Sequence, residues 1–167
     1  MKSTLQRWGM ATVILVTALS SNLAIAQKDF VFWPDADYDP AIPTFKQVLG
    51  HDPGERHTWH ADAVRYFHAL AQAAPDRVSV KPYAKSWEDR ELVYVVVTAP
   101  DNMTRIDEIK ATKQQLADPP ITSRAQAEQI IANQPAITWL AYGIHGNEAS
   151  STEAAMLTAY HLLAARG

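Results

Sequence analysis

One stretch near the end of the chain constrains the fold most strongly, because a strand signal, a tight turn and a helix signal follow one another directly. Residues 137–142 are an apolar run with β-branched and aromatic members between Pro135 and Gly143, which is typical of a buried strand. Residues 150–165 contain no glycine or proline and are rich in alanine and leucine, which predicts a helix. Between them, residues 145–148 read His-Gly-Asn-Glu.

His145 and Glu148 in this turn are candidate metal ligands. Zinc binds imidazole nitrogen and carboxylate oxygen, and a catalytic zinc site has three protein ligands and a water. A spacing of three residues at the start of a helix brings two side chains toward one point, and the helix dipole favours an ionised carboxylate there. Gly143 and Gly146 permit a sharp turn. A histidine and a glutamate that only cap the helix are the alternative, and the residues alone leave both open.

The chain before this stretch alternates helix and strand signals. The pattern predicts a helix from Thr58 to about Ala74, strands at 78–83 and 92–98, and helices at 104–117 and 123–133. Asp89 lies in the turn between the two strands and tolerates a left-handed conformation, which favours a β-hairpin. This order predicts an α/β fold in which helices flank a mixed central sheet.

The last of these helices carries its own start signal. Ser123 and Gln126 have the spacing of a capping box. We expect Ile130 and Ile131 to form the buried side of this short helix.

The first 26 residues have the three regions of a secretory signal peptide. Lys2 and Arg7 are basic, residues 9–19 are apolar, and residues 24–26 form a small-x-small cleavage site. We therefore expect cleavage after Ala26 and a secreted or periplasmic protein. The alternative is a membrane anchor, but the apolar run is shorter than the ~20 residues that a spanning helix needs. We expect no stable membrane anchor after cleavage.

Residues 27–56 are rich in proline, aspartate and aromatic side chains and show neither helical nor strand periodicity. We interpret them as an irregular leader whose aromatic side chains pack onto the domain. An exposed aromatic binding arm is the alternative.

Composition excludes several classes of protein. The chain has no cysteine, so disulfides, thiolate metal sites and a cysteine nucleophile are excluded. A formal charge of −3 gives no reason to expect nucleic acid as a partner. The sequence also lacks His-Glu-x-x-His and Gly-x-Ser-x-Gly, the motifs of common metalloproteases and of serine hydrolases. His57 and His60 have a ligand-like spacing, but we interpret them as surface residues at a helix start, because nothing nearby completes a site.

From about Gly54 onward, the chain resembles the zinc metallocarboxypeptidases of the carboxypeptidase A/B type. His145 and Glu148 match the family's first zinc-ligand motif, and the form His-Gly-Asn-Glu is similar to that of the regulatory carboxypeptidase branch. The hairpin sequence at 85–90 also resembles the family, with Asp89 where a glycine is usual. Residues 38–44 resemble the leader of large secreted bacterial members.

The resemblance implies a carboxypeptidase-like fold, a zinc cofactor and a peptide substrate that is hydrolysed at its C-terminus by metal-activated water. It assigns His145 and Glu148 as metal ligands. The family's third zinc ligand, general-base glutamate, substrate-gripping arginines and tyrosine lie well downstream of this motif. His161 is the only later histidine and does not match. No catalytic residue is therefore assigned in this chain.

We interpret residues 57–167 as the N-terminal part of a catalytic domain and expect the chain by itself to bind zinc poorly and hydrolyse nothing. Two alternatives stay open. One is a cell-wall peptide hydrolase or deacylase of the same fold, and the other is a non-catalytic binding module that has lost the site. The sequence predicts neither the side-chain specificity nor the oligomeric state.

Overall fold

The computed structural model describes residues 31–118 and 122–166. The chain divides into two compact units, one ending at Ala36 and the other beginning at Asp37. Every helix and strand of the described residues lies in the second unit. The expected signal peptide, residues 1–26, lies outside the described residues. No helix in the described ranges is long and apolar enough to cross a membrane.

The predicted β-hairpin is confirmed. Strand β2 (Val78–Lys85) pairs antiparallel with β3 (Glu91–Val97), and the register is interrupted by a bulge between Pro82 and Ala84. Asp89 adopts the left-handed conformation expected for it, with φ of 59°. The hairpin is therefore set by local turn chemistry, as the sequence indicates.

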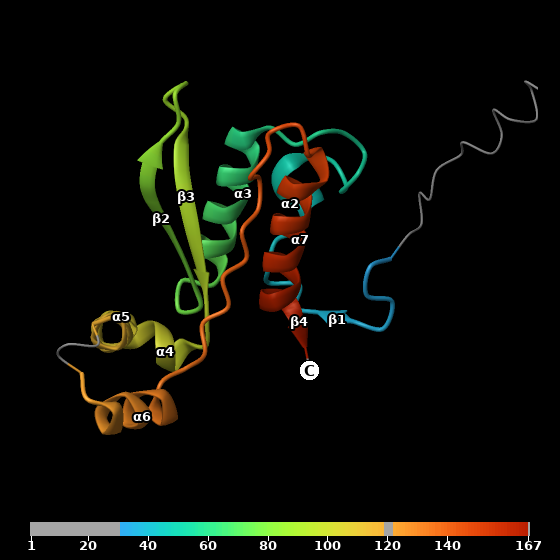
Figure 1. Cartoon of the computed structure of the whole chain (residues 1–167). Helices are drawn as coiled ribbons and strands as arrows, with labels where there is room; N and C mark the ends of the chain where they lie inside the picture. Colours follow the sequence, from blue (N-terminus) through green and yellow to red (C-terminus); the bar gives the residue numbers. More distant parts are fainter. Residues whose placement is uncertain (1–30, 119–121, 167) are drawn as a thin grey trace, which may run out of the picture. The chain divides into compact units, whose positions relative to one another are not determined.

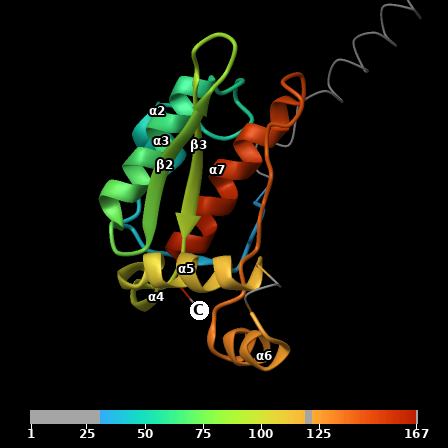
Figure 2. The same ribbon diagram turned by 60° about the vertical axis from the view of Figure 1, so that its left-hand side comes forward.

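Two helices cover one side of this hairpin. Helix α3 (His60–Ala73) packs against β2 and against α7 (Ala149–Ala164), and α7 also contacts β3. Figures 1 and 2 show both helices on the same side of the hairpin. The largest fully buried side chains are Tyr66 and Leu70 of α3 and Met156 of α7. The buried core consists of Ile42, Phe45, Leu49, Ala63, Tyr66, Leu70, Ala74, Val78, Met156, Ala159, Leu163 and Ala164.

The segment expected to be an irregular leader contains regular structure from Asp37 onward. Strand β1 (Asp37–Tyr38) pairs antiparallel with β4 (Ala165–Arg166) at the end of α7. Helix α2 (Phe45–Leu49) begins with a capping box between Thr44 and Gln47 and ends at Gly50 in the left-handed conformation. The sequence prediction missed α2 because five residues are too few to show a helical period. Phe45 is buried, which confirms that an aromatic side chain of this segment packs onto the domain.

Three helices connect the hairpin to the turn that contains His145. They are α4 (Pro100–Thr104), α5 (Ile106–Leu116) and α6 (Arg124–Asn133). The capping box of α6 is confirmed. The predicted burial is wrong for Ile131, which is 65% exposed, whereas Ile130 is half-buried; no residue of α6 is fully buried.

The predicted buried strand at 137–142 is also wrong. These residues are extended but unpaired, and all of them are exposed, with Trp139 at 77%. A strand needs a neighbouring backbone to bond with, and in residues 31–118 and 122–166 the paired strands are β1 with β4 and β2 with β3. The expected mixed central sheet is therefore replaced by two small antiparallel sheets, while the α/β class holds.

Candidate functional site

The turn that contains His145 and Glu148 leads from the extended segment into α7. The backbone N–H of Glu148 donates to the carbonyl oxygen of His145 at 3.1 Å. Gly143, just before the turn, has φ of 70°, a left-handed conformation that favours glycine. Both candidate ligands are exposed. The turn thus presents an imidazole and a carboxylate to solvent three residues apart.

The carboxylate of Glu148 is not used to cap the helix. Glu148 is the N-cap residue of α7, one position before the first turn in which we expected it, and its side chain makes no capping hydrogen bond. Helices usually satisfy their first N–H groups through an N-cap side chain. The alternative in which Glu148 merely caps the helix is therefore not supported by its geometry.

Two side chains of α7 hold the extended segment against the helix. The N–H of Gly143 donates to Oγ of Ser151 at 2.8 Å. The hydroxyls of Tyr142 and Thr158 lie 3.1 Å apart. The chain leading into the turn is therefore attached to α7 through side chains. We did not identify these residues from the sequence, although polar residues on a mostly apolar helix were the available signal.

A second attachment joins the loop after α2 to α7. The carboxylate of Glu153 accepts from the N–H of Gly54 at 2.8 Å and from the hydroxyl of Thr58 at 3.1 Å. The helix predicted to begin at Thr58 begins at His60: the hydroxyl of Thr58 donates to Glu153, and the N-cap is Trp59, without a side-chain bond. Glu153 was also missed, because its partners lie far away in the sequence.

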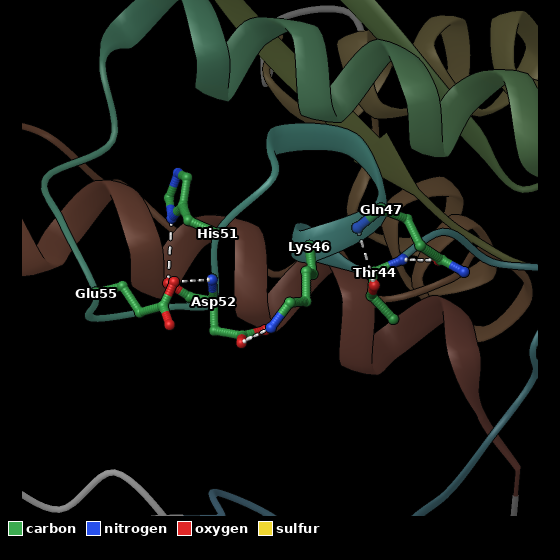
Figure 3. A network of polar contacts seen from close by, with 6 residues as sticks. All are labelled: Thr44, Lys46, Gln47, His51, Asp52 and Glu55. Carbon is green, nitrogen blue, oxygen red and sulfur yellow. Dashed lines mark hydrogen bonds and ion pairs between the residues drawn. The ribbon is translucent and has the colours of Figure 1, made fainter.

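Figure 3 shows the polar contacts of α2, its N-cap and the loop that follows it. Lys46 and Asp52 form an ion pair at 2.6 Å, and this bond raises the pKa of the Lys46 amine. A carboxylate oxygen of Glu55 accepts from the N–H of Asp52 at 2.9 Å. His51 is 4% exposed, with Nδ1 3.1 Å from the carbonyl oxygen of Asp52. These contacts fold the loop onto itself and leave no cluster of metal ligands.

The donor atoms of His145 and Glu148 fit two positions of a zinc site, since zinc takes imidazole and carboxylate ligands. A third ligand does not join them: the described residues contain no group of three His, Cys, Asp or Glu side chains that could hold a metal. His161 lies near the other end of α7, where Nδ1 is 3.0 Å from the hydroxyl of Tyr38. His60 lies at the start of α3, and its Nε2 is 2.8 Å from the carbonyl oxygen of Glu91.

A shallow cavity of about 190 Å³ lies at the start of α3. Its lining consists of Trp59, His60, Ala61 and Arg90. Arg90 is paired with Glu88, so its charge is already compensated.

The structure thus gives an α/β chain in which the two candidate ligands, His145 and Glu148, lie where an extended segment meets a helix. Residues 63–166 match the family described as zinc carboxypeptidase. The match covers more than half of the 167 residues and includes His145 and Glu148, and the chain belongs to the zinc carboxypeptidase family. Searches of curated proteins and of solved structures found no match.

Proposed function

We propose that this chain contributes two zinc ligands, His145 and Glu148, to a zinc-dependent metallocarboxypeptidase that acts on the C-termini of peptides. The observation that carries the proposal is the carboxylate of Glu148 at the N-cap of α7, which makes no capping hydrogen bond, within the region that matches the family. Bound zinc would polarise the scissile carbonyl and lower the pKa of a bound water to about 7.

The residues of this chain would hold the metal rather than move protons. Glu148 supplies a carboxylate from the N-cap of α7. His145 supplies an imidazole from the same turn. Within the described part of the chain, neither a third ligand nor a general base stands beside them. We therefore expect residues 27–167 to bind zinc weakly and to hydrolyse no peptide.

Zinc titration of the purified chain tests the ligand assignment, with histidine ring resonances followed by NMR. We expect His145→Ala and Glu148→Gln each to weaken zinc binding by roughly tenfold or more, because each removes a direct ligand. His68→Ala is the matched control, since His68 is exposed on α3 and should leave binding unchanged. Equal zinc affinity in all four proteins would contradict the proposal.

A peptidase assay tests the expected inactivity of residues 27–167. Release of C-terminal residues from a mixed peptide library, abolished by a chelator, would show that this chain completes an active site by itself. Release of acyl groups or cleavage of cell-wall peptides instead would indicate a different substrate for the same fold.

We further propose that the protein is secreted or periplasmic, with cleavage after Ala26. The support is the sequence of residues 1–26. N-terminal sequencing of the protein from its native host should begin at Gln27, and an intact N-terminus would contradict the proposal.

A further inference from the structure

Ser151 makes two hydrogen bonds that enclose the turn with the candidate ligands. Its Oγ accepts from the N–H of Gly143 at 2.8 Å. Its own N–H donates to the carbonyl oxygen of Glu148 at 3.1 Å. Ser151 is thus hydrogen-bonded to Gly143, two residues before His145, and to Glu148, three residues after it.

Few other contacts hold the backbone at Gly143 in place. Residues 135–143 form no strand in the described chain, so no sheet ladder fixes the backbone as it enters the turn. The left-handed φ of 70° at Gly143 sets the direction in which the chain turns, but a glycine by itself leaves the backbone free to move. A side-chain acceptor on α7 restricts that freedom.

Resting on the proposed function of His145 and Glu148, we propose that Ser151 is a positioning residue for the zinc-ligand pair. Its hydroxyl oxygen fixes the backbone before His145 onto the first turn of α7, which begins directly after the N-cap Glu148. The imidazole and the carboxylate are then presented to the metal from one closed turn, with less backbone entropy to lose on binding. Side chains that orient metal ligands in this way contribute measurably to metal affinity.

The test compares three variants of the full chain by zinc titration and by amide hydrogen exchange. Ser151→Ala removes the acceptor, Ser151→Thr keeps it, and Ser150→Ala changes a neighbouring exposed serine. We expect Ser151→Ala to weaken zinc affinity by roughly tenfold and to speed exchange of the Gly143 amide. Ser151→Thr should restore both, and Ser150→Ala should change neither.

The thermal midpoint separates positioning from stability. Because the bond between Gly143 and Ser151 lies at the exposed end of α7, Ser151→Ala should unfold within a few degrees of the wild type while it loses zinc affinity. Equal losses of affinity in Ser151→Ala and Ser151→Thr would overturn the proposal, since the hydroxyl would then not be the cause.

Failure of the positioning role is distinguishable from failure of the proposed function. If His145→Ala and Glu148→Gln weaken zinc binding but Ser151→Ala binds as the wild type does, Ser151 has no positioning role. If His145→Ala and Glu148→Gln leave zinc binding unchanged, the ligand assignment itself is wrong, and the proposal for Ser151 is overturned with it.

Discussion

The guanidinium group of Arg77 donates a hydrogen bond of 2.8 Å to the carbonyl oxygen of Leu163. A second bond of 3.0 Å reaches the carbonyl oxygen of Leu162. Arg77 directly precedes β2, whereas both carbonyls belong to the last turn of α7. These carbonyls have no partner within a helix, and the negative end of the helix dipole attracts a cation. Arg77 therefore fastens the C-terminal end of α7 to the start of the hairpin.

Arg77→Ala should lower the free energy of unfolding by about 1.5 kcal/mol, because it removes two hydrogen bonds from a charged donor. Arg77→Lys should retain only part of this stabilisation, since an ammonium group cannot form the same planar pair of hydrogen bonds. Chemical denaturation monitored by circular dichroism measures both. Arg124→Ala is the control: Arg124 forms an exposed ion pair with Glu128 on α6, and its loss should cost less than about 0.5 kcal/mol. Equal costs at the two arginines would show that Arg77 is not a helix cap.

Glu153→Ala should release the loop between Gly54 and Thr58 from α7. The N–H of Gly54 and the hydroxyl of Thr58 lose a charged acceptor. We expect the free energy of unfolding to fall by about 1–2 kcal/mol. Limited proteolysis should show faster cleavage within this loop. Glu128→Ala, on the exposed face of α6, should not change the cleavage rate. An unchanged rate in Glu153→Ala would mean that the loop is held by its internal contacts alone.

Stability should decline in alkali because of Tyr66. Its side chain is fully buried and its hydroxyl donates to the carbonyl oxygen of Pro43 at 3.1 Å. Burial, and secondarily the nearby Tyr160, raises the pKa of Tyr66, whereas an unfolded tyrosine ionises at about pH 10. A folded-state pKa above the unfolded value contributes stability below pH ~10 that is lost as pH rises further. The loss should be about 1.4 kcal/mol per pH unit for this one proton.

Tyr66→Phe should remove this part of the pH dependence, at a cost of about 1 kcal/mol at neutral pH for the lost hydrogen bond. The free energies of unfolding of the wild type and Tyr66→Phe, measured by denaturation at several pH values between 8 and 11, check this expectation. Tyr83→Phe changes an exposed tyrosine of β2 and should keep the wild-type slope. If Tyr66→Phe also kept that slope, Tyr66 would not be its source.

The exposed apolar segment at 137–144 should promote association of purified residues 27–167. Trp139 is 77% exposed and Ile144 is 72% exposed, and unpaired extended segments template aggregation. Trp139→Lys should lower light scattering on heating without lowering the unfolding midpoint, because little packing is lost. Ile131→Lys alters an exposed apolar residue on α6 and should have a smaller effect. A sharp, reversible melt of a wild-type monomer would contradict the expectation.

Helix and turn signals were predictable because they act over a few residues. The capping box of Ser123 with Gln126, the left-handed Asp89 and the helix after Glu148 all appear where the sequence indicates them. The exposure of Ile131 was not predictable, because a helical pattern does not say whether another element covers its apolar side. The ligand assignment of His145 and Glu148 came from the sequence and stays a prediction.

By itself, the sequence indicated the longer helices α3, α5, α6 and α7, the hairpin and the His-Gly-Asn-Glu turn of this zinc carboxypeptidase family member, since caps, glycines and apolar periodicity are local. Only the tertiary structure decided that residues 137–142 pair with no strand in the described part of the chain, and that Arg77, Ser151 and Glu153 fasten α7 to the rest of the domain. Strand pairing and long-range hydrogen bonds depend on which backbone lies within reach. The order of residues along the chain does not reveal which backbone segments lie close together.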